Sequence, residues 1–199
     1  CDILAKRARE NLGNFDNLKP KSVHYHKPVQ CGYREEKLTD ASWLSETLGR
    51  PEQLRASVGQ FFEMPASPHL AAAKEKKEVN LFANIPEDAD VIEGAGGVAV
   101  PLSFQANSQA YTWKNWLKER KQKGEQFKVI LTSSPILGTL SHTITAFEYL
   151  VSAQIEILGF LFVHTSPASP ANSEAFQIEK EITISNQETL EKLLQRPFL

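Results

Sequence analysis

The stretch that decides the fold is Asp90-Val91-Ile92-Glu93-Gly94-Ala95-Gly96-Gly97-Val98-Ala99-Val100-Pro101-Leu102. Two β-branched residues run into one carboxylate, Glu93, and then into a glycine-rich turn, which is the pattern of a buried parallel strand with an acid at its carboxyl end. Open α/β sheets bind their ligands at that end. Gly94, Gly96 and Gly97 allow the backbone to approach a phosphate closely or to adopt positive φ. A tight turn with a solvated glutamate fits the same pattern, so the stretch alone leaves both interpretations open.

The composition is that of a soluble globular protein. The chain has 199 residues, of which 41% are hydrophobic and 23% charged, and this length is enough for one domain with a sizeable core. A formal net charge of -2 gives no reason to expect nucleic acid as a partner. The one basic run, Lys118–Lys123, is interrupted by Glu119 and is typical of a solvated helix end.

Cysteine usage and hydropathy indicate a cytoplasmic protein that does not enter a membrane. Cys1 and Cys31 form neither a disulfide framework nor a metal-ligand spacing, which suits a reducing compartment. The longest apolar run, Ile157–Val163, is too short to span a bilayer, and no signal peptide opens the sequence.

Apolar periodicity and turn residues predict an alternation of helices and strands. Helices are predicted over Ile3–Leu12, from Thr39 to Leu48, over Pro51–Gly59, Leu70–Lys76 and Tyr111–Lys123, from Leu137 to about Ser152, and over Leu190–Leu194. Strands are predicted over Ser22–Lys27, Glu87–Ile92, Lys128–Thr132 and Ile155–Val163, and loops over Phe104–Ser108 and Ser166–Pro170. The alternation predicts an α/β fold: one domain, residues 1–199, built on a parallel sheet with helices on both faces.

The first predicted strand carries three residues of interest. We expect Lys27 at its carboxyl end, because Pro28 follows directly. His24 and His26 would share one face, and a pair of histidines without a third ligand favours packing within the sheet over a metal site.

The helices carry expectations about caps and anchors. Thr39 or Asp40 is expected to cap its helix, and Ser185 with Glu188 matches a capping box for the last one. The residues expected on the apolar helix faces are Trp43, Leu44 and Leu48 in the first of these helices, and Trp113, Trp116 and Leu117 in the helix that follows Tyr111.

Polar or glycine-rich groups follow several predicted strands. Lys27 follows one strand, Glu93 and its glycines follow another, and the Leu137-Gly138 turn follows a third. A lysine with two carboxylates, Asp40 and Glu93, is what a magnesium nucleotide site requires, because Mg²⁺ takes hard oxygen ligands and an ammonium group meets phosphate charge.

An ordered set of motifs resembles one enzyme family. The set is Lys27-Pro28-Val29-Gln30-Cys31-Gly32, Thr39-Asp40-Ala41, Ser67-Pro68-His69, Glu93-Gly94-Ala95-Gly96-Gly97 with Pro101-Leu102, and Leu137-Gly138-Thr139-Leu140-Ser141-His142. From residue 1 to about residue 164 the chain is similar to ATP-dependent dethiobiotin synthetases, which have a P-loop fold. The resemblance implies closure of the ureido ring of dethiobiotin from 7,8-diaminononanoate, CO₂ and ATP, by a homodimer.

The resemblance also implies roles for individual residues. Lys27 would be the catalytic lysine, Asp40 and Glu93 would hold Mg²⁺, and Gly94, Ala95 and Gly96 would lie along the nucleotide phosphates. The substrate would be contacted by Cys31, where the family usually has Ser or Thr, and from across the dimer interface by Leu137, Gly138 and Ser141 at a helix start.

Three features depart from the family pattern. The sequence contains no Gly-x-x-x-x-Gly-Lys-Ser/Thr, and this P-loop would precede the helix predicted over Ile3–Leu12, so we expect an N-terminally incomplete P-loop fold. The connection from His69 to Asp90 is short, and Val163-His164-Thr165 replaces an Asn at the base-recognition position. Two alternatives to the enzyme therefore stay open: a non-catalytic relative that keeps the fold and dimer surface, and another P-loop synthetase of cofactor biosynthesis.

Overall fold

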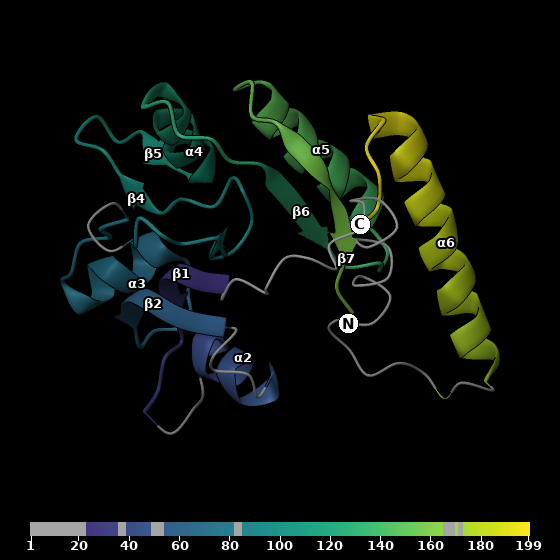
Figure 1. Cartoon of the computed structure of the whole chain (residues 1–199), viewed down its shortest axis with the longest axis horizontal. Helices are drawn as coiled ribbons and strands as arrows, with labels where there is room; N and C mark the ends of the chain where they lie inside the picture. The colour runs from purple at the N-terminus through teal and green to yellow at the C-terminus, as the bar shows by residue number, and fades with distance from the viewer. Residues whose placement is uncertain (1–22, 36–38, 49–53, 82–84, 165–169, 171–172) are drawn as a thin grey trace, which may run out of the picture. The chain divides into compact units, whose positions relative to one another are not determined.

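A computed structural model describes residues 23–35, 39–48, 54–81, 85–164, 170 and 173–199, and divides the chain into two compact units (Figure 1). One unit comprises Asp16–Trp116, and the other contains Leu117–Leu199. Each unit is described by itself below. The predicted helix over Ile3–Leu12 and most of the loop predicted over Ser166–Pro170 lie outside the described residues.

The first unit is built on a three-stranded parallel sheet in the order β2-β1-β3. Its strands are β1 (Val23–Cys31), β2 (Leu54–Phe62) and β3 (Val91–Ile92). Two predictions were wrong here. β2 occupies most of the segment predicted as a helix over Pro51–Gly59. The strand predicted to be buried before Glu93 is the two-residue edge strand β3, in which Val91 is 49% exposed, and the centre of the sheet is β1.

β1 continues through Pro28 to Cys31, so Lys27 lies inside the strand and not at its end as predicted. The carbonyl oxygens of His24 and His26 accept hydrogen bonds from Asp90 and Glu93 at the β3 side. Backbone groups of alternate residues point to the same side of a strand, so Pro28 also faces that side, where β3 has already ended at Ile92. The missing N–H of Pro28 therefore costs no ladder hydrogen bond, which is why the strand passes through it.

The helices α2 (Asp40–Leu48) and α3 (Pro68–Glu75) pack on opposite sides of β1 and β2 (Figure 1). This follows from the topology, because the chain moves from β1 to β2 in one direction and from β2 past β1 to β3 in the other, and parallel crossovers are right-handed. The prediction of helices on both faces is confirmed for this sheet. In α2, Ala41 is buried and Trp43 is 55% exposed, so the predicted apolar face at Trp43 was wrong.

A small hairpin and the first turn of α4 complete this unit. β4 (Ser103–Phe104) and β5 (Ala110–Tyr111), which were not predicted, pair antiparallel, and most of the loop predicted over Phe104–Ser108 connects them. Gln105 N–H donates to the Gln109 carbonyl oxygen at 2.9 Å. α4 (Trp113–Gln122) begins directly after it. Its side chains Trp113 and Trp116 are buried, as predicted, with their rings edge to face at 5.5 Å.

The second unit contains the parallel pair β6 (Val129–Ser133) and β7 (Ile157–Phe162), joined by α5 (Thr139–Val151). All three were predicted from the sequence within a few residues. The C-terminal residues run beside β7, where Phe198 makes a parallel bridge with Phe160. Strands pair in parallel within the β2-β1-β3 sheet and between β6 and β7, with helical crossovers between them, which confirms the predicted α/β class.

The last helix, α6, spans Glu174–Leu194 and is much longer than the predicted Leu190–Leu194. Its N-cap is Ser173, whose side chain accepts a hydrogen bond from Phe176 N–H at 3.1 Å, and not Ser185. In the described part of the chain, no helix combines the length and apolar character needed to cross a membrane.

Candidate functional site

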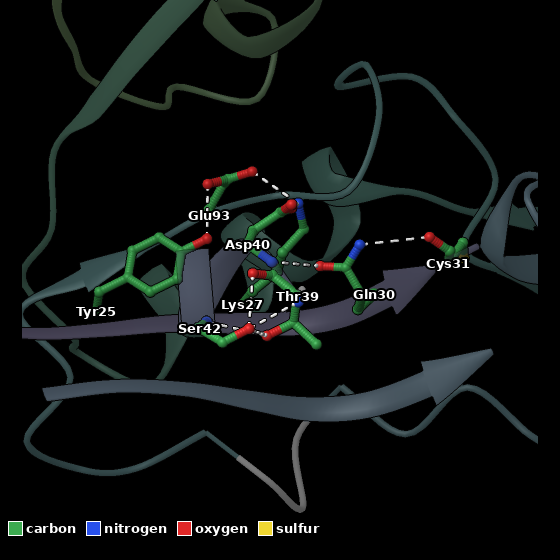
Figure 2. A network of polar contacts seen from close by, with 8 residues as sticks. All are labelled: Tyr25, Lys27, Gln30, Cys31, Thr39, Asp40, Ser42 and Glu93. Atoms are coloured by element: carbon green, nitrogen blue, oxygen red, sulfur yellow. Dashed lines mark hydrogen bonds and ion pairs between the residues drawn. The ribbon is translucent and has the colours of Figure 1, made fainter. Parts of the chain in front are cut away.

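The ammonium group of Lys27 is the centre of a polar cluster in the first unit (Figure 2). Lys27 Nζ donates to Asp40 Oδ2 and to Glu93 Oε1, the latter at 2.8 Å. The lysine comes from the middle of β1, Asp40 from the first turn of α2, and Glu93 from the residue after β3. Lys27 is 8% exposed, whereas the side chains of Asp40 and Glu93 are 44% and 46% exposed. The carboxylates thus hold a buried cation and still face solvent.

Tyr25 completes the cluster from the same strand. Its hydroxyl donates to Glu93 Oε2 at 2.7 Å, so the two oxygens of Glu93 are bound by two different residues of β1 (Figure 2). Residues two apart in a strand point to the same face, which is why Tyr25 and Lys27 reach the same carboxylate.

Asp40 is placed by a reciprocal cap at the start of α2. Ser42 N–H donates to Thr39 Oγ1 at 3.0 Å, and Thr39 N–H donates to Ser42 Oγ at 2.8 Å. Thr39 is therefore the N-cap residue, one of the two predicted, and Asp40 stands in the first turn, where a negative charge is favoured by the helix dipole.

The ionisation of the cluster follows from its burial and its charges. Burial alone would lower the pKa of Lys27, but hydrogen bonds from its ammonium group to Asp40 and Glu93, with the charges of both, raise that pKa above the ordinary value. Burial, followed by the hydrogen bond to Glu93, raises the pKa of Tyr25. At neutral pH the cluster therefore contains a charged lysine and a tyrosine that donates its proton to a hydrogen bond.

A pocket of about 390 Å³ lies beside this cluster. It is formed by the end of β1, the start of α3 and the glycine-rich loop after Glu93. Its lining residues are Lys27, Val29, Gln30, Cys31, Ala66, Ser67, Pro68, Ala95, Gly96 and Val100. The pocket has the size of a small-molecule site and one buried cation in its wall.

The glycine-rich loop is shaped by two of its glycines. Gly96 has a φ of 71°, in the left-handed region that favours glycine. A Cβ atom on Gly94 would lie 3.2 Å from Trp113 Cε2, so the loop passes close to the indole ring. The indole N–H of Trp113 donates to the Ala95 carbonyl oxygen at 3.0 Å, which fixes the loop at the pocket wall.

The structure brings most of the predicted site residues together. Lys27, Asp40 and Glu93 are in direct contact, and the residues that line the pocket include Lys27, Cys31, Ala95 and Gly96. Gly94 lies in the same loop against Trp113. The roles of these residues stay predictions.

The remaining predicted residues belong to the second unit. Gly138 is the N-cap residue of α5 with a φ of 94°, Leu137 before it is 99% exposed, and Ser141 lies in the first turn of the helix. Their contact with a substrate stays a prediction.

Several residues of the site were not predicted. Tyr25 could have been found from the two-residue period that relates it to Lys27. Gln30, Ser67 and Pro68 were quoted only for the family resemblance, and they line the pocket together with Val100. No local sequence signal marks these four, because their place depends on how the segments fold together.

His24 and His26 pack within the sheet, as the sequence favoured. Both are buried and lie within hydrogen-bond distance of Ser57 Oγ, at 2.9 Å from His24 Nε2 and 2.8 Å from His26 Nδ1. Among the described residues, no group of three or more His, Cys, Asp and Glu side chains is arranged to hold a metal ion.

The chain is similar to one family model and to several curated enzymes that share one name. Residues 15–199 match the family model described as an AAA domain. The ATP-dependent dethiobiotin synthetase BioD of Geobacillus sp. (strain WCH70) is 29% identical over 184 residues, which cover 87% of this chain and 68% of that protein. The same enzyme of Agrobacterium fabrum is 32% identical over 144 residues, 71% of this chain and 62% of that protein.

A third relative, the ATP-dependent dethiobiotin synthetase BioD of Geobacillus kaustophilus, is 31% identical over 189 residues, which cover 89% of this chain and 71% of that protein. Across these three relatives, the chain spans between 62% and 71% of the relative's length.

Proposed function

Because the chain belongs to the family of ATP-dependent dethiobiotin synthetases, we propose that it closes the ureido ring of dethiobiotin from 7,8-diaminononanoate and CO₂ at the expense of ATP, in biotin biosynthesis. The reaction class is that of a cyclo-ligase. The observation that carries the proposal is the contact of Lys27 with Asp40 and Glu93 at the wall of a pocket that the glycine-rich loop also lines.

Lys27 is proposed as the catalytic residue. Its buried ammonium group supplies a fixed positive charge at the pocket wall, where the transferred phosphoryl group and the carbamate would lie. A preorganised cation of this kind stabilises negative charge that develops in a transition state, and removal of one such donor typically costs about 10² to 10³ in rate.

Asp40 and Glu93 are proposed to hold Mg²⁺. Their half-exposed carboxylates meet at one point, the Lys27 ammonium, and supply the hard oxygen ligands that Mg²⁺ prefers. Two carboxylates suit this ion, because it takes its other ligands from water and phosphate. Bound Mg²⁺ supplies charge that neutralises the phosphates. The same carboxylates accept hydrogen bonds from Lys27, so the proposed ion and the ammonium group would share them.

The other parts of the proposal concern the ligands and the assembly. Gly94, Ala95 and Gly96 would follow the nucleotide phosphates, since glycine allows close approach of the backbone. Cys31 of one protomer would contact the diamine, and Leu137, Gly138 and Ser141 of its partner in a homodimer would contact the substrate carboxylate. We propose a single functional domain that acts in the cytoplasm.

The experiment is a turnover assay on the polypeptide as its own cell makes it. With the diamine, bicarbonate and Mg·ATP, we expect release of ADP together with dethiobiotin, identified by mass spectrometry. Lys27→Gln should reduce product formation by at least about 10². Lys121→Gln, which removes a lysine that lies outside the cluster, is the matched control and should retain activity. No ADP release with this diamine would refute the proposed reaction and leave the non-catalytic or other-synthetase alternatives.

A further inference from the structure

We propose that Tyr25 is a positioning residue of the magnesium site: its hydroxyl fixes the orientation of the Glu93 carboxylate towards the cation. This inference rests on the proposed function, and it concerns a residue that neither the motifs nor the comparisons single out. It follows from how the two oxygens of Glu93 are shared within the cluster (Figure 2).

Glu93 has little else to hold its side chain. Its backbone is tied to β1, because Glu93 N–H donates to the His26 carbonyl oxygen at 2.9 Å. Its side chain is 46% exposed and lies just beyond the two-residue strand β3. A half-exposed glutamate ordinarily samples several rotamers, and ordering it costs free energy. A site that requires one orientation therefore needs a partner that supplies it.

Tyr25 supplies that orientation from a rigid position. It is 6% exposed in the central strand, paired with Ala56 of β2 on one side and with Val91 of β3 on the other. A tyrosine in such a position has few accessible rotamers, so its hydroxyl is a fixed donor. At 2.7 Å it binds Glu93 Oε2 and leaves Oε1 directed to Lys27.

The two carboxylate oxygens of Glu93 have different partners, and this difference matters for metal binding. Oε2 is bound by a neutral donor, which does not compete with a cation for charge, whereas Oε1 is bound by the lysine that a metal ion would replace. The hydrogen bond from Tyr25 would therefore leave Oε1 available to hold a cation. Tyr25 would keep the side chain in one orientation with or without the ion, which is the preorganisation that a metal site needs.

The test is Tyr25→Phe, which removes the hydroxyl and keeps the ring. We expect the Mg²⁺ concentration for half-maximal ADP release to rise about tenfold, the fold-change that loss of a hydrogen bond to a charged group produces. The KM for the diamine should change less than about twofold, because Tyr25 acts on the carboxylate and not on the substrate. Tyr33→Phe, which removes another hydroxyl of the same unit, should leave the Mg²⁺ requirement unchanged.

A binding measurement makes the result independent of turnover. Mn²⁺ is a paramagnetic substitute for Mg²⁺, and its affinity in the presence of a non-hydrolysable ATP analogue can be read by electron paramagnetic resonance. We expect Tyr25→Phe alone to weaken Mn²⁺ binding about tenfold. Added to Glu93→Gln, the same substitution should leave the Mn²⁺ affinity of the single Glu93 variant unchanged, because Tyr25 acts only through Glu93.

The outcomes separate the inference from the proposed function. An unchanged Mn²⁺ affinity in Tyr25→Phe would overturn the inference, and so would an equal further loss in the Glu93→Gln background. A rise in the KM of the diamine that matches the rise in Mg²⁺ requirement, with a lower melting temperature, would indicate general damage and also overturn it. If wild-type protein binds Mn²⁺ but makes no dethiobiotin, the proposed reaction fails while the Mn²⁺ comparison still decides the role of Tyr25.

Discussion

The indole N–H of Trp113 donates to the carbonyl oxygen of Ala95 over 3.0 Å, and this bond joins the first residue of α4 to the glycine-rich loop at the pocket. Trp113 is 5% exposed, so the helix start is anchored, and the loop takes its position from it. A loop with glycines at 94, 96 and 97 has little conformational preference of its own. The position of the loop therefore depends on this contact.

Trp113→Phe tests that dependence. The variant keeps an aromatic anchor and removes the donor, so we expect the free energy of unfolding to fall by about 1 kcal/mol from the lost hydrogen bond, in addition to the loss of packing. Nucleotide affinity, measured by calorimetry, should fall several-fold because the loop loses its tether. Trp116→Phe replaces the neighbouring buried indole and is the control. It should lower the free energy of unfolding and leave the nucleotide affinity unchanged. Equal affinities in both variants would show that the loop keeps its position without Trp113.

Glu93→Gln should abolish magnesium-dependent turnover and leave the fold intact. The amide keeps an oxygen of nearly the same shape but loses the charge that a metal site uses, so we expect at least about a 10²-fold loss of rate. The melting temperature should fall only modestly, since Glu93 is half-exposed and Asp40 still pairs with the buried Lys27. Glu46→Gln, an exposed carboxylate of α2, is the control. Normal activity of Glu93→Gln would exclude Glu93 as a required ligand.

Glu75 gives the loop after β2 a dependence on pH. Its Oε1 accepts from Glu63 N–H at 2.7 Å and Met64 N–H at 3.2 Å, and its Oε2 is bound by Lys77. The hydrogen bond from Lys77, with those from the backbone, lowers the pKa of Glu75 below its ordinary value of 4.5. Because the pKa is lowered in the folded state, the stabilisation is present above pH 4.5 and is lost as the pH falls through the folded pKa.

Glu75→Gln isolates that contribution. At pH 7 the variant should melt below wild type, and the difference between the two melting temperatures should shrink as the pH falls below 4.5. Scanning calorimetry of both proteins from pH 7 to pH 3 measures this difference in melting temperature. A difference that stays constant across this range would show that the ionised carboxylate does not stabilise the loop.

Gly159→Ala should displace the C-terminal residues from β7. A Cβ at this position would lie 2.5 Å from the Pro197 carbonyl oxygen and 3.0 Å from Leu199 Cγ. We expect a loss of about 1–3 kcal/mol, measured by denaturant unfolding. Gly124→Ala is the control: its φ is 83° with no atom within 4 Å of the new Cβ, so its cost is only about 1 kcal/mol of backbone strain. Equal losses in both variants would argue against close contact at Gly159.

The sequence predicted the cluster around Lys27 better than the strands that hold it. Lys27, Asp40 and Glu93 were singled out, and they are in contact. The strand β2 was predicted as a helix although Leu54, Ala56 and Val58 alternate with polar residues and glycine, as they do in a strand. Ala56 and Gly59 do not favour strands, and pairing with β1 overrides this local preference.

The start of the longest described helix, α6, was also predicted wrongly, for a different reason. Ser185 with Glu188 matches a capping box, but α6 begins at Ser173, where the hydroxyl alone caps the first turn. Exposed residues such as Ile178 and Ile182 in its first half blur the apolar stripe on which such predictions depend.

The bridge between Phe198 and Phe160 has a consequence for assembly. A strand at the border of a sheet offers unpaired N–H and C=O groups to any extended chain, which is a route to strand exchange and aggregation. Phe160 N–H donates to the Pro197 carbonyl oxygen, and the Phe160 carbonyl oxygen accepts from Leu199 N–H, each at 3.0 Å. The protein thus shields the border of β7 with its own backbone, and a partner strand would first have to displace these residues.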